Sequence, residues 1–376
     1  MRDSAGIPVV ENRPELSADS CAIPTEPLVD IGVVEGEPEY QLYRVMDGAT
    51  LSDGRIAIVN QGSDEIRIYD ADGRFVDAFG REGGGPGEFR DVFMVWRIPG
   101  DTLVVADYRP WRFQYFTPGG EFIRAVEPTP TYINTPAVVG VMADGTFVIG
   151  RETNDAYREE PGFHPQHLHL VRHGPDGAAL DTIGVYMAGR RGNLPGGENV
   201  RLTGTPLFEP RTVVAAGGER IVVGAGEEAE LRILDVDGEL RRLVRWTVGD
   251  RDVPPSEVEA YRRNVLELYD DPAARQRFAE PQISDDRPVN DRFPAHATIR
   301  IDRSDRIWVR QYPRPSWPEG DRWWVFDRDG RFACHAVTPP MNVWDIFEIG
   351  VDYLLGAQQD ELDVEHVRVF ELNKGR

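Results

Sequence analysis

The sequence is short of lysine, of cysteine and of long apolar runs. Lys374 is the only lysine among 42 basic residues, so arginine carries nearly all of the positive charge. No apolar stretch approaches the roughly 20 residues that a membrane-spanning helix needs, which argues against a membrane span. Cys21 and Cys334 are the only cysteines, and the sequence leaves open whether they pair or remain free thiols.

The charge balance is strongly acidic. The chain has 64 acidic residues and a formal net charge of -22, which argues against a nucleic-acid partner, because phosphate neutralisation needs clustered lysine and arginine. A local arginine pocket is still compatible with this charge, since the planar guanidinium binds carboxylates and phosphates in a bidentate manner. A codon bias toward arginine would give the same composition without a pocket.

The N-terminus does not have the pattern of a signal peptide. No apolar stretch follows the opening residues Met1 to Ser4, and a secretory leader requires one. The chain is therefore either a cytoplasmic protein as written or a mature exported domain, periplasmic or at the cell surface, whose leader has been removed.

Short alternating segments separated by glycine-rich turns repeat along the chain, which contains 38 glycines and 29 prolines. In the clearest copy, Arg55 to Asn60, Ile66 to Tyr69 and Phe75 to Phe79 are bounded by Asp-Gly or glycine-rich turns. This pattern predicts antiparallel strands linked by hairpins. Five further copies follow, so internal repetition governs the fold.

The repeats predict one all-β domain over residues 1–376, a six-bladed β-propeller. The last copy has three strands, and residues 28–33 are expected to supply its fourth, which closes the ring and protects the sheet edges. A pair of β-sandwiches or an open solenoid is the alternative. The expected blades are residues 42–80, 91–127, 136–186, 206–249, 295–338 and 343–371.

Residues 254–280 break the strand pattern between the fourth and fifth blades. Ser256 and Glu259 fit a capping box. Apolar residues recur at helical spacing after them: Val258, Tyr261, Val265, Leu268 and Tyr269. The segment predicts an inserted helix that could act as a lid.

The repeats, and above all Phe79-Gly80-Arg81 to Gly85-Pro86-Gly87-Glu88-Phe89, resemble the NHL-like six-bladed β-propellers. The resemblance is sharpest over residues 50–125. Among these propellers the chain looks most like exported, often lipid-anchored bacterial members, which implies an exported location with the leader removed; a cytoplasmic location is the alternative. The resemblance implies the propeller fold and says little about function, because NHL-like rings serve as binding platforms and as enzymes.

Propeller geometry would bring several polar residues to one face, where the loops between blades and the loops after the second strands meet. The expected ligand-binding residues are Asn60, Arg81, Asp107, Arg109, Trp111, Arg151 and Arg310. Arg190 and Arg191 are expected in another loop on this face. His296, just before an innermost strand, is the candidate general base. The structural alternative is that these arginines pair with neighbouring carboxylates, and that Asp107 caps a turn.

A metal site is less favoured by the sequence. His167 and His169 alternate onto one face of a predicted strand, near His164 and His173, but no cysteine or acidic partner completes a zinc set. A channel calcium ion, as in propeller lactonases, needs converging oxygen ligands, and Arg151 and Arg310 would oppose it. We therefore predict no cofactor and no metal, and disfavour calcium.

Three functions are compatible with this pattern. The preferred prediction is a binding or interaction propeller whose arginine-rich face holds an anionic or carbohydrate-like ligand. The second is a hydrolase or lyase with His296 or a carboxylate as base and arginines stabilising negative charge. The third is a scaffold that binds a protein partner.

Overall fold

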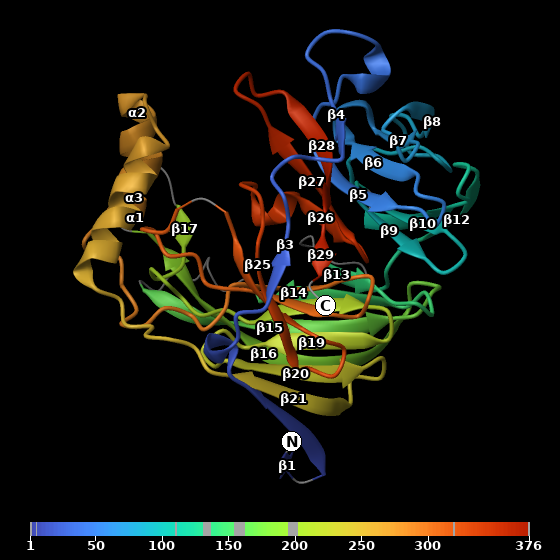
Figure 1. The fold of residues 1–376 in the computed structure, drawn as a ribbon. Helices are drawn as coiled ribbons and strands as arrows, with labels where there is room; N and C mark the ends of the chain where they lie inside the picture. The colour runs from blue at the N-terminus through green and yellow to red at the C-terminus, as the bar shows by residue number, and fades with distance from the viewer. Residues whose placement is uncertain are drawn as a thin grey trace.

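The computed structural model describes residues 2–4, 6–109, 111–130, 137–153, 162–194, 202–318 and 320–374. These residues are mostly in strands, which form six sheets. Each sheet is built on antiparallel strands that follow one another in the chain, and we number the sheets in that order. The described α-helices all lie in one insertion (Figure 1), whereas short 3-10 helices occur elsewhere in the chain.

The first three sheets come from residues 45–204. Sheet 1 contains β5 (Val45–Thr50), β6 (Ile56–Asn60), β7 (Glu65–Tyr69) and β8 (Phe75–Phe79). Sheet 2 contains β9 (Val92–Ile98), β10 (Thr102–Tyr108), β11 (Trp111–Phe116) and β12 (Phe122–Val126). Sheet 3 contains β13 (Ala137–Val141), β14 (Phe147–Glu152), β15 (Phe163–His173), β16 (Ala179–Asn193) and β17 (Thr203–Gly204).

The remaining sheets combine strands of the second half of the chain with strands of the N-terminal segment. Sheet 4 is built on β18 (Val213–Gly217), β19 (Arg220–Gly224), β20 (Glu230–Asp235) and β21 (Leu240–Trp246). Sheet 5 is built on β22 (Thr298–Ile301), β23 (Ile307–Arg310), β24 (Arg322–Phe326) and β25 (Phe332–Val337). Sheet 6 is built on β26 (Ile346–Ile349), β27 (Tyr353–Gln359) and β28 (Glu365–Glu371).

Asp-Gly turns set the hairpins inside these sheets. Gly73 and Gly330 follow Asp72 and Asp329 and have φ angles of 81° and 79°. This left-handed region costs glycine little, because glycine has no Cβ. The turns recognised in the sequence therefore mark real strand boundaries.

The sheets pack face to face around a common axis. Each neighbouring pair shares a buried apolar cluster: Phe113 of sheet 2, for example, stacks on Phe147 of sheet 3 with ring centroids 4.4 Å apart. The sixth sheet packs on the first through Leu355 and Ile58. The first strands lie side by side, since β5 contacts β9 and β26, and β18 contacts β13 and β22. This radial packing is that of a β-propeller.

The N-terminal segment, residues 2–31, runs along the outer edges of three sheets. Its strand β4 (Val29–Ile31) pairs with β28, and the two lie together in Figure 1; residues 28–33 were expected to close the last sheet in this way. No strand was expected in the remainder of the segment. A hairpin of β1 (Arg2–Ser4) and β2 (Ile7–Asn12) extends sheet 4, where β2 runs parallel to β21.

The next strand of this segment joins both ends of the chain to sheet 5. β3 (Ser20–Ala22) lies between β25 and β29 (Asn373–Lys374). Cys21 of β3 forms a disulfide with Cys334 of β25, with their Cα atoms 5.7 Å apart. The two cysteines therefore pair, which settles the question that the sequence left open.

The insertion contains several helical pieces instead of one helix. These are α1 (Pro255–Glu267), α2 (Pro272–Ala274), a π-helical stretch (Arg275–Ala279) and α3 (Glu280–Ile283). The predicted capping box is wrong, because Pro254 is the N-cap residue and no side chain caps the helix. Val258 and Tyr261 pack on the core as predicted, whereas Leu268 is 75% exposed.

No helix in the described part of the chain is both long enough and apolar enough to cross a membrane.

Candidate functional site

Two adjoining cavities lie where sheets 3, 4 and 5 meet the insertion. The first has a volume of about 360 Å³ and the second about 200 Å³, and Thr205, Arg211 and Arg287 line both. Their walls come from loops after second strands, from links between sheets and from the insertion. These elements lie on the face where the sequence predicts a ligand. We call the two cavities together the cleft.

The first cavity, the apolar chamber, has mainly apolar and aromatic walls. Its apolar and aromatic residues are Pro206, Leu207, Phe208, Tyr261, Pro294, Ala297, Tyr312, Pro313 and Pro315. The second cavity, the arginine chamber, is lined by Glu152, Gln166, Ala188, Arg190, Arg191 and Gly204 besides the three shared residues. Arginines predominate over carboxylates among the ionised side chains of the two chambers, in a chain whose net charge is -22.

Arg287 is a buried guanidinium in the cleft wall, with only 9% of its surface accessible to solvent. Its Nε donates to the Thr205 carbonyl at 2.8 Å, and its Nη1 donates to the Tyr261 hydroxyl at 2.9 Å and the Gln282 carbonyl at 2.8 Å. These partners are neutral, and no described carboxylate pairs with Arg287. A buried guanidinium without a counter-charge is costly unless an anion compensates it.

Arg190 and Arg211 are each held by one glutamate. Arg190 donates to Glu209 through Nε and Nη2, at 3.0 and 2.7 Å, and Glu209 also accepts from the Asn290 amide at 2.9 Å. Arg211 pairs with Glu152 and donates from Nε to the Ala188 carbonyl at 3.2 Å. These contacts fix the two guanidiniums at the cleft wall, where they can present further N–H groups.

Arg190 and Arg191 lie in a strand, whereas the sequence predicted a loop. The prediction ended that strand near Val185, but β16 continues to Asn193. Glycines at 184, 189 and 192 look like breaks in the sequence, and irregularities in the pairing with β15 accommodate the long strand.

His296 is buried beside the apolar chamber, with 2% of its surface accessible. Its Nε2 accepts a hydrogen bond from the backbone N–H of Gly226 at 3.2 Å. In the neutral ring the proton is then on Nδ1, which has no hydrogen-bond partner among the described residues. Burial, helped by the charge of Arg251, lowers the pKa of His296 to about 4.

This arrangement gives His296 the character of a hydrogen-bond donor. The lone pair that a general base needs is on Nε2, which the Gly226 N–H already occupies. The only nitrogen left to interact with a ligand is the protonated Nδ1. The geometry therefore does not support the predicted role of His296 as a base.

Backbone geometry shapes the walls around His296. Phe208 has a φ angle of 57°, a conformation that is costly for a bulky side chain. Its ring packs against Phe293 with centroids 4.8 Å apart and against Tyr261 and Tyr312. A Cβ at Gly224 would lie 2.6 Å from the His296 ring, so only glycine leaves room for the imidazole there.

Of the predicted catalytic and ligand-binding residues, only His296 lines the cleft, together with Arg190 and Arg191, which were also expected on this face. Asn60 and Asp107 are buried and serve the backbone: Asn60 accepts from the Tyr43 N–H at 2.8 Å, and Asp107 accepts from the Asp91 N–H at 3.0 Å. Asp107 also pairs with Arg112. The turn-capping alternative for Asp107 therefore describes its contacts.

The predicted ligand-binding arginines and Trp111 lie outside the cleft. The Arg81 and Arg109 side chains are each 78% exposed and pair with Glu88 and Asp91. Arg310 pairs with Asp321. Arg151 is exposed at the end of β14, and Trp111 stacks on Phe93 with ring centroids 5.7 Å apart.

The histidines of β15 are dispersed. His173 is buried and donates from Nδ1 to the Gly177 carbonyl at 2.9 Å, whereas His167 is exposed. Within the described ranges, no three His, Cys, Asp or Glu side chains are grouped to hold a metal ion.

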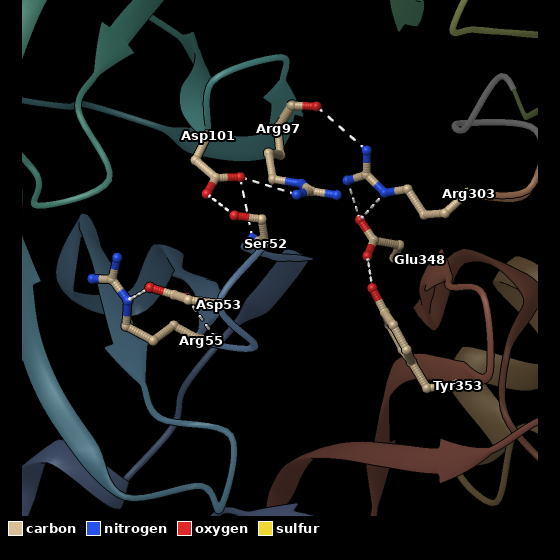
Figure 2. Close-up of polar contacts among 8 residues, drawn as sticks. All are labelled: Ser52, Asp53, Arg55, Arg97, Asp101, Arg303, Glu348 and Tyr353. Atoms are coloured by element: carbon tan, nitrogen blue, oxygen red, sulfur yellow. Dashed lines mark hydrogen bonds and ion pairs between the residues drawn. The ribbon is translucent and has the colours of Figure 1, made fainter.

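A second polar cluster lies at the opposite ends of the strands, at the turns between first and second strands (Figure 2). Arg97 donates to Asp101 at 2.9 Å, and Asp101 also accepts from Ser52. Arg303 donates through Nε to Glu348 at 2.9 Å, and Glu348 also accepts from the Tyr353 hydroxyl. We call these five residues and Ser52 the opposite-face network.

The comparisons with known proteins are limited to distant likeness in structure. No family model and no curated protein matches the sequence, so membership of the NHL-like family stays a prediction. A putative exported protein from Bacteroides fragilis is 11% identical, with a TM-score of 0.49 over 98% of this chain and 100% of that chain. A member of the DUF4221 family from Bacteroides vulgatus is 12% identical, with a TM-score of 0.48 over 96% and 100%.

A virginiamycin B lyase from Staphylococcus aureus is also similar, at 10% identity and a TM-score of 0.40 over 92% of this chain and 98% of that chain. Likeness at this level carries no argument about function.

Proposed function

We propose that this protein binds a small organic anion in the cleft. The observation that carries the proposal is Arg287, a buried guanidinium whose described partners are all neutral, in a cleft that is richer in arginine than in carboxylate. A carboxylate or phosphate of the ligand would supply the missing counter-charge through two parallel hydrogen bonds.

The proposal also fits the size and lining of the cleft. Ligand pockets commonly measure a few hundred Å³ and combine apolar walls with a few fixed polar groups. The apolar chamber has this size. Arg190, Arg211 and Arg287 are each fixed by hydrogen bonds, so little side-chain ordering is needed when an anion binds.

Citrate is a suitable probe, because several carboxylates can contact several arginines. We expect citrate, compared with chloride at equal ionic strength, to raise the melting temperature of the wild type and to give a saturable calorimetric titration. Arg287→Met should abolish both effects. Arg81→Met is the matched control, since Arg81 is exposed and lies outside the cleft.

A second variant covers the case in which Arg287→Met does not fold. Arg191 is exposed in the arginine chamber, and its one described hydrogen bond is to Thr203 at 3.4 Å, so Arg191→Ser should fold and bind citrate several-fold more weakly. No citrate binding by the wild type, or undiminished binding by both variants, would overturn the proposal.

We propose further that each of the six sheets is one blade, so that the chain is a six-bladed propeller. The packing of sheet 6 on sheet 1 and the pairing of β4 with β28 support this count. A crystal structure in which another sheet lies between sheets 6 and 1 would contradict it.

An exported location is the third part of the proposal. The Cys21–Cys334 disulfide supports it, because such bonds persist mainly in oxidising compartments. Thiol alkylation in the native cells, followed by mass spectrometry, should find both cysteines blocked from reagent until reduction. Free thiols at both positions would place the protein in a reducing compartment.

A further inference from the structure

The cleft has two chemically different halves that meet at Arg211 and Arg287. On one side are the prolines, aromatic rings and Leu207 of the apolar chamber, and on the other side are the guanidiniums of the arginine chamber. The two halves adjoin, since Thr205, Arg211 and Arg287 line both. One ligand placed at this boundary can therefore contact both halves.

We infer that the ligand is an aromatic carboxylate whose ring also carries a hydrogen-bond acceptor. The carboxylate binds the arginine chamber, the ring fills the apolar chamber, and the acceptor meets Nδ1–H of His296. This inference deepens the proposed function and depends on it.

The walls of the apolar chamber favour a flat, rigid ring. Pro206, Pro294, Pro313 and Pro315 have no free rotamers to order on binding. Phe208 is held in its unusual backbone conformation by three aromatic neighbours, so that wall is fixed as well. A rigid ring placed against fixed walls loses little conformational freedom on either side.

The boundary between the chambers favours a carboxylate attached to that ring. The Arg287 guanidinium lies over the Tyr261 ring, 5.6 Å from its centroid, and both residues line the apolar chamber. A carboxylate at this boundary would reach Arg287 and Arg211 while the ring remains between aromatic and proline side chains. The Nη2 group of Arg287 has no described hydrogen-bond partner and is the donor that the carboxylate would use.

His296, which lines the apolar chamber, selects the second polar group of the ligand. Its Nδ1 is buried without a described partner, and a buried donor left unpaired is costly. Since the imidazole is neutral, it favours a neutral acceptor such as a carbonyl over a second anion. A site built to hydrogen-bond one ligand atom discriminates strongly against a ligand that lacks it.

Three probe ligands test separately the contributions of the carboxylate and of the hydrogen-bond acceptor. Para-acetylbenzoate has the ring, the carboxylate and a carbonyl acceptor. Para-isopropylbenzoate has nearly the same shape without the acceptor, and para-acetylbenzamide has the acceptor without the charge. By calorimetry, the wild-type protein should bind para-acetylbenzoate about 10- to 100-fold more tightly than either of the others.

His296 variants test the acceptor directly. His296→Phe keeps a ring but removes the donor, so it should bind the acetyl and isopropyl benzoates equally. His296→Asn retains a donor near the Nδ1 position and should keep part of the preference. His167→Phe is the control, since His167 is an exposed histidine that does not line the cleft.

The outcomes distinguish this inference from the proposed function. If citrate binds through Arg287 but the wild type does not prefer the acetyl compound, the inference is wrong and the proposed function stands. A preference that persists in His296→Phe also overturns the inference. If neither citrate nor any benzoate binds, the proposed function itself fails. The probe comparison in the wild type needs no variant to fold.

Discussion

The cleft and the opposite-face network are both rich in arginine, but they use it differently. In the opposite-face network every guanidinium has its own carboxylate: Arg97 has Asp101, and Arg303 has Glu348 (Figure 2). In the cleft, Arg287 has only neutral described partners and His296 keeps a donor without one. The arginines of the network are therefore neutralised by carboxylates of the protein itself, whereas Arg287 of the cleft is not.

This difference shows that arginine abundance alone does not identify a binding site. Many described arginines pair with a carboxylate of their own turn or sheet, as Arg97 does with Asp101, and others, such as Arg303 with Glu348, link neighbouring sheets. A binding site requires charge or hydrogen-bonding capacity that the fold itself leaves unused, which is the case where the insertion meets sheets 3, 4 and 5.

The largest expected effect concerns acid stability and His296. Because the folded pKa is about 4 and the ordinary value is 6.5, the unfolded chain binds more protons between these values. Stability is therefore fully retained above pH 6.5 and falls as the pH drops toward 4, by up to about 3 kcal/mol. His296→Phe should lack this loss.

Chemical denaturation of wild type and His296→Phe across this pH range measures the difference. Burial also raises the pKa of Asp47, to about 7, and this contributes a slope of opposite sign. That slope is present in both proteins, so the comparison cancels it. Parallel pH profiles for the two proteins would show that His296 is not held neutral in the fold.

The next largest effects are expected from replacing one carboxylate in each region, Glu348 in the opposite-face network and Glu209 beside the cleft. Glu348→Gln should lower the free energy of unfolding by about 1–3 kcal/mol and leave citrate affinity unchanged, because Glu348 serves only the opposite-face network. Glu209→Gln should also destabilise, by less, since the Arg190 side chain is 42% exposed. It should tighten citrate binding roughly threefold by releasing Arg190.

Denaturation and calorimetric titration of both variants test this pair. If Glu209→Gln weakens citrate binding, Glu209 positions Arg190 for the ligand and is not a competitor for it. If Glu348→Gln changes the affinity, the two regions are not independent.

The smallest effects belong to the exposed arginines that the sequence suggested as ligand-binding residues. Arg81→Met and Arg109→Met remove surface ion pairs, which contribute about 0–1 kcal/mol. We expect stability within about 0.5 kcal/mol of the wild type and unchanged citrate affinity. A large loss of affinity would extend the site to sheets 1 and 2.

More of the fold than of the candidate site could be predicted from the sequence. Asp-Gly turns and alternating apolar residues located most strands, since turn chemistry and burial both act locally. The partner of β4 was predicted from the incomplete last repeat. The outer hairpin β1–β2 was missed, because a strand that adds to an existing edge leaves no repeat of its own.

The site was harder because a polar residue at a strand end can serve either the backbone or a ligand. Asn60 and Asp107 have the pattern of channel-mouth residues, yet neighbouring N–H groups use their oxygens. Arg287 has no motif around it. The one available signal in the sequence was its position a few residues after the predicted helical insertion. Only the fold shows that its hydrogen-bond partners are neutral.

The disulfide between Cys21 and Cys334 makes most of the chain one covalent circle. Its two cysteines are 313 positions apart, so the circle includes the insertion and every residue that lines the cleft. A protease that cuts one exposed loop within it would leave both pieces covalently attached and still hydrogen-bonded through β3. A single cleavage in the helical insertion would therefore not release a fragment of the protein.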